Sequence, residues 1–484
     1  MSDQRQNPVL NSPGFTELMA IRNGPALAHD EITVTGADPL YTSPFRIGET
    51  AAAALAARGV AANDLWQLRN GERQTLSIDV LAAAATSLYG GDMTQRRDAA
   101  GVYHPIPYSD AMQRMVAMTQ PWQTRDGRWL LPHTNLAHLE QRVLQVIGCQ
   151  GGVDAIRDRI AGWDAEALEH AIADANACAG MVRTPEQWLA HPHGAYLASR
   201  PVVEITKIDD TPPQPLAPAA QPLAGVRVLD LTRILAGPTA GLGLAEHGAD
   251  VLMVTAPHLP QIPSFVRDTS HGKRSCFLDI NHPAEADRLY TLAQHCDVFI
   301  DGYRPHRLAG HGFGAERLIA LRPGLVHVTV NCYGSGGPFA TRAGWDQVAQ
   351  AVTGICHTQG LATGAGRPQL TPVFMCDFLT GFLASFGAML ALARRAREGG
   401  SYRVQVSLCQ SAMFLQRQGL IEGFEQAPNR LSPEAFERLA VRDNGTVYGD
   451  LKTLGPVLKM SRTPCAWFGT TPALGSSEAR WLPC

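Results

Sequence analysis

The stretch 223–254 most constrains the fold, because it reads as a strand, a helix and a second strand in close succession. Apolar residues alternate over 223–231, Gly237 and Pro238 mark a turn, and 249–254 is apolar again. A strand–helix–strand unit of about 30 residues is the building block of a parallel sheet. Such sheets bind ligands at the carboxyl ends of their strands, where helix N-termini favour phosphate. The turn lacks the Gly-x-Gly-x-x-Gly spacing of dinucleotide-binding proteins, so NAD use is not predicted.

Length and charge narrow the class of protein further. A chain of 484 residues exceeds the size of one hydrophobic core, so we expect at least two lobes. A net charge of -3 argues against a nucleic-acid surface but leaves room for a local basic pocket. There is no signal-peptide pattern, and the apolar stretches at 51–57 and 382–393 fall short of a membrane span. We expect a cytoplasmic protein that binds neither nucleic acid nor membrane.

Cysteine and histidine usage gives no sign of metal binding. The ten cysteines are scattered without a C-x-x-C pair, which favours reduced thiols over disulfides or structural zinc. The sixteen histidines show no metal-binding spacing with a nearby carboxylate. We therefore expect no metal and no tightly bound cofactor.

A proline-rich linker divides the chain. Five prolines between Thr211 and Pro222 are typical of a semi-rigid spacer. We predict a first lobe at 1–205, a linker at 206–222, a second lobe at 223–415 and a poorly defined tail at 416–484. Within the lobes, the patterns predict helices at 49–68, 136–148, 165–179, 283–296 and 378–396, strands at 76–80, 276–280, 297–300, 325–330 and 402–408, and a hairpin turn at 124–129.

An internal repeat is indicated by matched spacings around two helix ends. Gly71 and Gly399 each follow a predicted helix, and an alternating strand begins at the same distance beyond each glycine. Counting back equally from the two glycines gives Glu49 in one copy and Asp377 in the other. A carboxylate at the same place in both copies favours duplication over chance.

The second lobe resembles the class III coenzyme A transferases, the carnitine-dehydratase and bile-acid-inducible family. The resemblance covers roughly 222–415 and implies an α/β fold with a Rossmann-like parallel-sheet lobe and a second α/β lobe in an interlocked architecture. Two segments of the first lobe match the family's later half, which implies permuted or duplicated halves. The segments that carry the resemblance are 223–232, 236–238, 248–251, 272–275, 278–279, 303–305, 334–338 and 344–346, with 126–129 and 183–188 in the first lobe.

The resemblance also implies a reaction and a set of site residues. In the family, an aspartate at the start of a helix attacks an acyl-CoA, forms a mixed anhydride, and then carries CoA as an aspartyl thioester to an acceptor carboxylate. The matching residue is Asp377. An ionised carboxylate needs no base to act as a nucleophile, and a helix N-terminus stabilises the anion. The implied partners are acyl-CoA, a carboxylic acid and a second copy of the chain as a homodimer. The expected CoA-binding residues are Ile234, Lys273, Arg274, Leu278, Arg304 and Arg342.

Departures from the family pattern keep two alternatives open. Thr255-Ala256 replaces an acidic–basic pair that usually contacts the nucleotide, which leaves a non-catalytic CoA-binding or scaffold protein as one alternative. The other is an α-methylacyl-CoA racemase-type isomerase, which uses a histidine where this chain has Trp345. Glu49 is expected to be structural, because a longer carboxylate would displace the nucleophilic oxygen, and Asp346 is expected to have a structural loop role.

Overall fold

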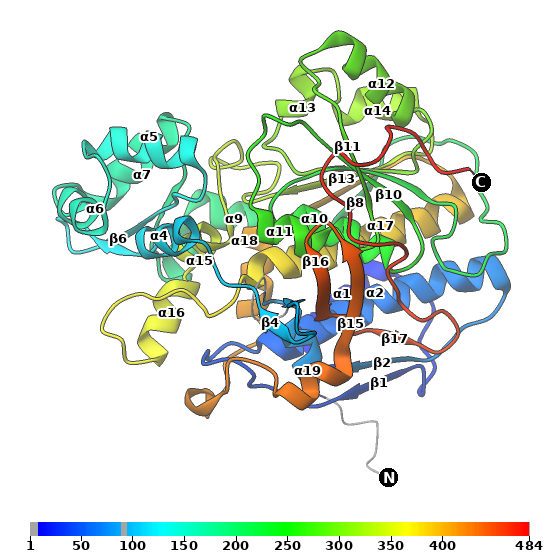
Figure 1. Cartoon of the computed structure of the whole chain (residues 1–484), viewed down its shortest axis with the longest axis horizontal. Coiled ribbons are helices and arrows are strands. Elements are labelled where there is room, and N and C mark those ends of the chain that lie inside the picture. The colour runs from blue at the N-terminus through cyan, green and yellow to red at the C-terminus, as the bar shows by residue number, and fades with distance from the viewer. Residues whose placement is uncertain (1–7, 89–93, 484) are drawn as a thin grey trace.

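The computed structural model describes residues 8–88 and 94–483 and is built around one seven-stranded sheet (Figure 1). Six strands are parallel and the edge strand β8 is antiparallel. The spatial order is β11 (Arg274–Phe277), β10 (Asp250–Thr255), β9 (Arg227–Leu231), β12 (Val298–Asp301), β13 (Val326–Asn331), β14 (Tyr402–Ser407) and β8 (Glu204–Lys207). After the edge strand β8, the chain continues at the centre with β9, adds β10 and β11 on one side and then crosses to β12, β13 and β14 on the other. This is the doubly wound order, so the predicted Rossmann-like fold is confirmed.

Alternate side chains of the strands pack into two separate cores, one on each face of the sheet. Val228, Val251 and Val298 lie in the larger core with α10 (Ala236–Ala245) and α17 (Met375–Glu398). Leu229 and Leu252 lie in the second core with α12 (Pro283–Ala293), α13 (Arg307–Gly310) and α14 (Ala315–Leu321). Near-continuous apolar strands covered by helices on both faces are typical of a parallel sheet.

Helix α17 is the central element of the larger core. It has 24 residues and packs against α10, α2 and strands β13 and β14. By length and mean hydropathy it could cross a membrane, but its most apolar window is wholly buried inside the protein. The helix is longer than the apolar stretch that the sequence indicated, and its surroundings are those of a core helix in a folded domain.

The predicted internal repeat is present as a second, shorter set of elements. Helix α2 (Ile47–Asn70) also has 24 residues and ends at Gly71, as α17 ends at Gly399. One constant shift in sequence relates both ends of the two helices, the two glycines, and the next N-caps, Asp79 and Ser407. The following short elements also match: β2 (Leu76–Asp79) with β14, and α3 (Val80–Ala85) with α18 (Leu408–Gln416).

Sheet pairing extends this correspondence beyond the helices. Strand β1 (Ile32–Thr35) pairs with β2 in parallel, and β17 (Lys459–Met460) pairs with β2 antiparallel. Strands β13 and β8 flank β14 with the same two orientations. The three-stranded sheet β1-β2-β17 therefore repeats the β13-β14-β8 end of the large sheet, without counterparts of β9 to β12 among the described residues. We call the elements β1, α2, β2, α3 and β17 the short copy, and β8 to α18 the full copy.

A smaller lobe stands to one side of both copies (Figure 1, left). Its three-stranded antiparallel sheet is covered by α5, α6 and α7, and its apolar residues form a core of their own. The predicted hairpin turn at Asp126-Gly127 joins β5 to β6. The elements are β5 (Trp122–Gln123), β6 (Trp129–Pro132), β7 (Ala179–Met181), α4 (Asp110–Met118), α5 (Ala137–Ile147), α6 (Val153–Ile160) and α7 (Ala165–Asp174). Helices α8 (Pro185–Ala190) and α9 (Pro192–Ala198) follow in the chain and pack in the larger core through Trp188 and Leu197.

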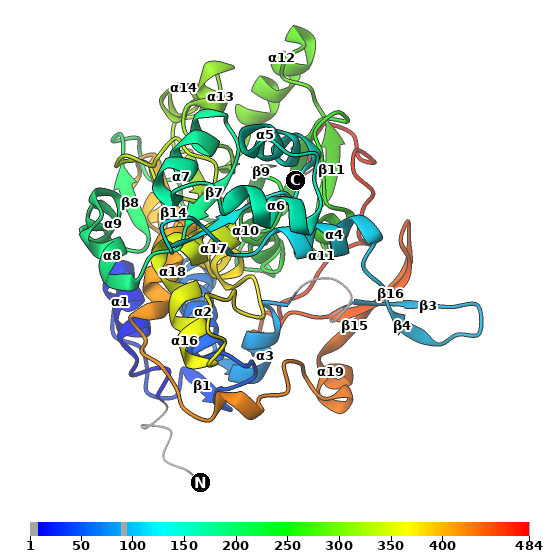
Figure 2. The ribbon, with the colours of Figure 1, turned by 90° about the vertical axis from the view of Figure 1, so that its left-hand side faces the viewer.

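The predicted division at the proline linker differs from the folded arrangement. Strand β8 precedes the linker yet belongs to the large sheet, and α2 packs along α17. The tail is also structured, since β17 completes the short copy and residues beyond it contact β11 and α12. A four-stranded sheet, which projects in Figure 2, joins β3 (Thr94–Arg97) and β4 (Tyr103–Pro105) to β15 (Ala440–Thr446) and β16 (Gly449–Leu454). The remaining helices are α1 (Pro13–Arg22), α11 (Pro263–Thr269), α15 (Asp346–Thr353), α16 (Ile355–Ala362) and α19 (Pro433–Leu439).

Candidate active site

A cavity of about 420 Å³ opens at the carboxyl ends of the parallel strands. Each of the six strands contributes its last residue or one soon after it, and the start of α5 lines the cavity from the small lobe. The strand-end residues are Leu231, Thr255, Leu278, Gly302, Asn331 and Leu408. The cavity spans the point between β9 and β12 at which the strand order reverses, and this is where doubly wound sheets bind their ligands.

The loop after β9 shapes one wall of the cavity. Arg233 and Ile234 follow the strand directly, and α10 begins two residues later. Ile234 has a φ of 76°, a left-handed conformation that is costly for a β-branched residue. Such strained positions cluster at functional sites, and this one places a predicted CoA-binding residue in the lining.

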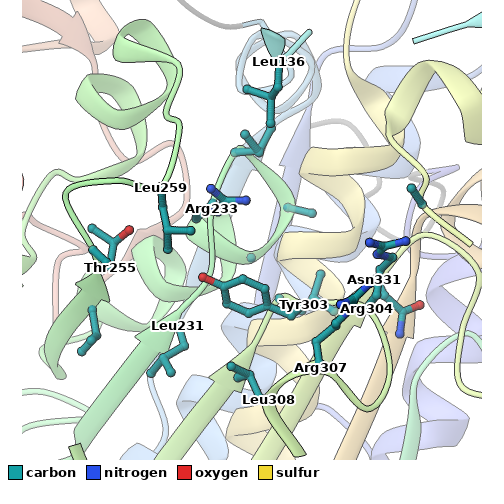
Figure 3. A pocket seen from close by; sticks show the side chains of 18 of the residues that line it. Leu136, Leu231, Arg233, Thr255, Leu259, Tyr303, Arg304, Arg307, Leu308 and Asn331 are labelled. Carbon is teal, nitrogen blue, oxygen red and sulfur yellow. The ribbon is translucent and has the colours of Figure 1, made fainter. Parts of the chain in front are cut away.

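Three arginines give the cavity a positive lining (Figure 3). Arg304 and Arg307 lie beside Asn331, and Arg233 stands on the other side of Tyr303, with its guanidinium 5.8 Å from that ring's centroid. Burial, and then the charge of Arg307, lower the pKa of Arg304. At the mouth, burial and three nearby arginines lower the pKa of His138. An electropositive pocket of this kind attracts phosphate groups.

Asp377 reaches the same cavity from the first turn of α17. It is buried, and burial, followed by the charge of Asp346, raises the pKa of its carboxyl well above the ordinary value. Burial thus opposes the ionisation that the sequence led us to expect, and hydrogen-bond donors or positive charge near the carboxyl would favour it.

Asp346 fixes the position of the Asp377 backbone. Its Oδ2 accepts a hydrogen bond from the Asp377 backbone N–H at 3.0 Å, and its Oδ1 accepts one from Gln350 Nε2 at 2.5 Å. Burial raises the pKa of Asp346 to about 6, although these hydrogen bonds oppose the shift. Asp346 thus caps the helix that carries Asp377, a more specific role than the loop position expected from the sequence.

The aromatic wall next to Asp377 contains Trp345. Its ring stacks on His133 at a centroid distance of 4.4 Å. His133 lies outside the cavity lining, and its Nε2 is 3.1 Å from Gln347 Oε1. Burial lowers the pKa of His133 to about 3, so this ring is neutral at physiological pH.

Three of the predicted CoA-binding cations do not line this cavity, because each is paired elsewhere. Lys273 is fully buried, with Nζ 2.9 Å from Asp230 Oδ2 and 2.7 Å from the carbonyl of Pro238, so it braces β9 against α10. Arg274 forms a two-pronged pair with Asp250. Arg342 lies 3.5 Å from Glu169 and over the ring of Phe339.

The other predicted residues, Ile234, Leu278, Arg304 and Asp377, meet in the cavity. Sequence reasoning missed Arg233 and Arg307. Arg233 could have been found, because it is the first charged residue after the central strand, next to the switch point. Arg307 reaches the cavity through a short helix that no sequence pattern indicated.

Comparison with known proteins identifies the class. Residues 223–440 match the family model described as CoA-transferase family III. The acetyl-coenzyme A transferase nodX of Hypoxylon pulicicidum is 32% identical over 324 residues, which span 62% of this chain and 54% of that protein. The succinyl-CoA:glutarate CoA-transferase of Mus musculus is 34% identical over 211 residues, or 41% of this chain and 48% of that protein. Residues 223–440 are therefore similar to CoA-transferase family III.

Coverage of the relatives is partial. The chain spans about half the length of the curated relatives that it matches. Among solved structures, the Rv3272 protein of Mycobacterium tuberculosis aligns at 32% identity with a TM-score of 0.39, over 40% of this chain and 56% of that one.

Proposed function

We propose that this protein transfers coenzyme A from an acyl-CoA donor to a carboxylic acid acceptor through Asp377. One observation carries the proposal: a buried carboxylate at a helix N-terminus shares a cavity with three arginines at the switch point of a doubly wound sheet. Relatives named as CoA transferases support the same class of reaction.

Binding would use the two ends of the cavity differently. The phosphates of CoA would lie against Arg233, Arg304 and Arg307, where charge-assisted hydrogen bonds are strongest. The thioester would reach Asp377 at the far end. Leu136, Leu139 and Trp345 line the cavity and offer apolar surface for an acyl group. Acyl-CoA is thus held as an extended molecule with its reactive carbon at the start of α17.

The chemistry begins with attack of the Asp377 carboxylate on the thioester carbonyl carbon. A C–O bond forms and the C–S bond breaks, which gives a mixed anhydride and the CoA thiolate. The thiolate then attacks the aspartyl carbonyl, expels the donor acid and leaves an aspartyl-CoA thioester. The acceptor carboxylate repeats both steps in reverse, and Asp377 is regenerated.

Asp346 and the helix N-terminus would support these steps. Asp346 holds the Asp377 backbone in place, so the reacting carboxyl group is positioned before the substrate arrives. The N–H groups in the first turn of α17 favour the negative charge that develops on the attacked carbonyl. The like charge of Asp346 also disfavours the ionised resting carboxylate, which makes that anion more reactive.

The isomerase alternative lacks the second base at the family's position, although three histidines at other positions line the cavity: His138, His258 and His311. A racemase-type reaction needs a second base across the substrate α-carbon, and Trp345 occupies the position where that histidine would be. A homodimer remains a proposal.

Mass spectrometry tests the mechanism directly. The intact protein is incubated with a panel of acyl-CoAs and trapped with a nucleophile such as hydroxylamine. We expect a hydroxamate at Asp377 and no labelling at Glu49. Turnover without any covalent adduct would contradict the aspartyl-CoA route. Turnover in D₂O with rapid α-deuteration of a 2-methylacyl-CoA would favour the isomerase instead.

A further inference from the structure

A second, smaller cavity lies where the two copies meet. It has a volume of about 90 Å³ and is lined by α2, α10 and α17, by residues 453–457, and by His271 and Trp467. Its lining shares no residue with the cavity of the candidate active site. We call it the inter-copy cavity. By the criterion that one water needs at least about 10–15 Å³, it has room for a molecule of roughly five or six non-hydrogen atoms.

Buried polar atoms without partners gather around the inter-copy cavity. Arg58 Nε, Thr239 Oγ1, His271 Nε2 and Trp467 Nε1 are all buried and have no hydrogen-bond partner among the described residues. The side chains of Arg58, Thr239 and His271 are at least nine-tenths buried. Leaving a buried donor or acceptor unsatisfied costs roughly 1–3 kcal/mol, so four such atoms on one small cavity point to an occupant.

Arg58 defines the strongest requirement for an occupant. Its Nη2 donates to Glu246 Oε2 at 2.6 Å, and its guanidinium lies 5.8 Å from the ring centroid of Phe382. This is one hydrogen bond for a group that carries five N–H donors. Because Arg58 is buried and its Nε has no partner among the described residues, the guanidinium needs a further oxygen acceptor, and a molecule in the cavity can supply it.

His271 supplies the complementary acceptor. The hydroxyl of Thr471 donates to Asp443 Oδ2, so its oxygen accepts from His271 Nδ1. With Nδ1 as the donor to Thr471, the neutral tautomer of the ring presents Nε2 as an acceptor. The cavity therefore offers donors at Arg58 and Trp467, an acceptor at His271 and a hydroxyl at Thr239. An occupant that carries a donor and an acceptor on one group fits this set.

The charges and the apolar surface of the cavity further restrict the chemical class of the occupant. Glu246 already balances Arg58, and Asp268, which also lines the cavity, is paired with Arg267, so an additional anion would be buried without a counter-charge. Leu55, Leu242 and Phe382 provide apolar walls for a short chain. We propose that the inter-copy cavity binds a short-chain aliphatic carboxylic acid in its neutral form. The carboxyl group would lie among Arg58, Thr239 and His271, and the alkyl chain against the three apolar residues.

This site is an accessory one, and binding there does not depend on the proposed transferase activity. Its lining includes Phe378, the residue that follows Asp377 on α17. An occupant would fill space between α2, α10 and α17 and would stabilise the contact between the two copies. The ligand belongs to the same chemical class as the proposed acceptor. The contact between the two copies would therefore become more stable as the concentration of the carboxylic acid rises.

Ligand titrations of the full chain test the proposal. Propionate is titrated and followed by thermal shift and ligand-observed NMR, with 1-propanol as a probe that lacks the carbonyl. We expect saturable binding of propionate at mildly acidic pH and none of propanol. Thr239→Val keeps the shape of the side chain, removes its unpartnered hydroxyl and should weaken binding about three- to tenfold. Arg58→Met should weaken it more than tenfold.

Matched controls decide the outcome. Arg304→Ala alters only the larger cavity and should leave propionate binding unchanged. Since Arg58→Met leaves Glu246 unpaired and could misfold, the isosteric Thr239→Val variant is the deciding one. Equal propionate affinity in Thr239→Val and the unmodified protein would overturn the assignment. So would a high-resolution crystal structure, grown with propionate, that holds only water in the inter-copy cavity.

Discussion

The full copy and the short copy share a helix, a turn and a strand, but only the full copy opens onto the larger cavity at the strand ends. Asp377 in the full copy and Glu49 in the short copy stand at the same position of equivalent 24-residue helices. Asp377 lines a cavity of about 420 Å³ with three arginines. Glu49 instead forms an ion pair with Arg46 at 2.8 Å. The difference lies in β9 to β12, which supply the ligand-binding edge and have no counterpart in the short copy.

The two copies nevertheless retain the same device at the helix start. Asp38 accepts hydrogen bonds from the backbone N–H groups of Gly48 at 3.0 Å and Glu49 at 2.8 Å. Asp346 binds the backbone of the equivalent Asp377 at 3.0 Å. Burial raises the pKa of both capping aspartates to about 6. A buried aspartate cap is thus common to both copies. The proposed reaction depends on the cavity that β9 to β12 form in the full copy alone.

The largest expected effect separates the two equivalent carboxylates. Asp377→Asn keeps the shape of the side chain but removes the nucleophile, so turnover should fall by at least about 10³-fold, more than the loss of one oxyanion donor. Glu49→Gln should keep nearly full activity, because Glu49 lies outside the cavity lining. Steady-state kinetics with melting curves makes the comparison. Similar losses in both variants would mean that the short copy is also catalytic.

The next effect tests whether the cavity cations bind CoA. Arg304→Ala should weaken CoA binding by about 1.5–3 kcal/mol, or roughly 10- to 150-fold in Kd, because Arg304 lines the cavity and the bond is charge-assisted. Arg274→Ala is the matched control, since its guanidinium is paired with Asp250 outside the cavity. Calorimetry at low salt measures both. A larger loss of CoA affinity in Arg274→Ala than in Arg304→Ala would mean that the phosphates bind at the edge of β11 instead.

Local patterns made much of the full copy predictable. Strands β9 and β10 are short apolar runs next to glycine and proline, and α2 and α17 each end at a glycine. Asp377 was found because the repeat and the family motif point to the same residue. The prediction that Asp377 is catalytic therefore rests on the order of elements along the chain.

Long-range pairing was not predictable from those patterns. Lys273 and Arg274 were expected to bind CoA, but they pair with the carboxylates of Asp230 on β9 and Asp250 on β10. The lack of a signal for long-range pairing also explains why the predicted division at the proline linker differs from the folded arrangement. No local signal places β8 at the edge of a sheet whose other strands all follow it, or β17 beside β2 across most of the chain.

A smaller effect concerns the pH dependence of the reaction. Burial and then Asp346 raise the pKa of Asp377, so activity should fall as pH drops and the nucleophile gains a proton. Asp346→Asn removes the like charge and should shift the acid limb of the kcat profile to lower pH. Burial, and then the charge of Asp346, also raise the pKa of the Cys376 thiol, which lies next to this pair. Asp38→Asn, the equivalent change in the short copy, should leave the profile in place, and an equal shift in both variants would contradict a direct effect on Asp377.

The smallest effect is on stability and concerns the short copy alone. The folded-state pKa of Asp38 is about 6, above the ordinary 3.8, so folding favours its protonated form. Its contribution to stability is complete below pH 3.8 and is lost as pH rises through 6. In Asp38→Asn the amide does not titrate. The change in stability that it causes by facing the N–H groups of Gly48 and Glu49 is therefore the same at every pH. The melting temperature of the variant relative to the unmodified protein should therefore rise by roughly 1–4 °C between pH 4.5 and 7.5, as expected for about 1–2 kcal/mol. A difference that stays flat or falls over this range would mean that the Asp38 cap is ionised throughout, and that the two copies do not share a buried, proton-binding cap.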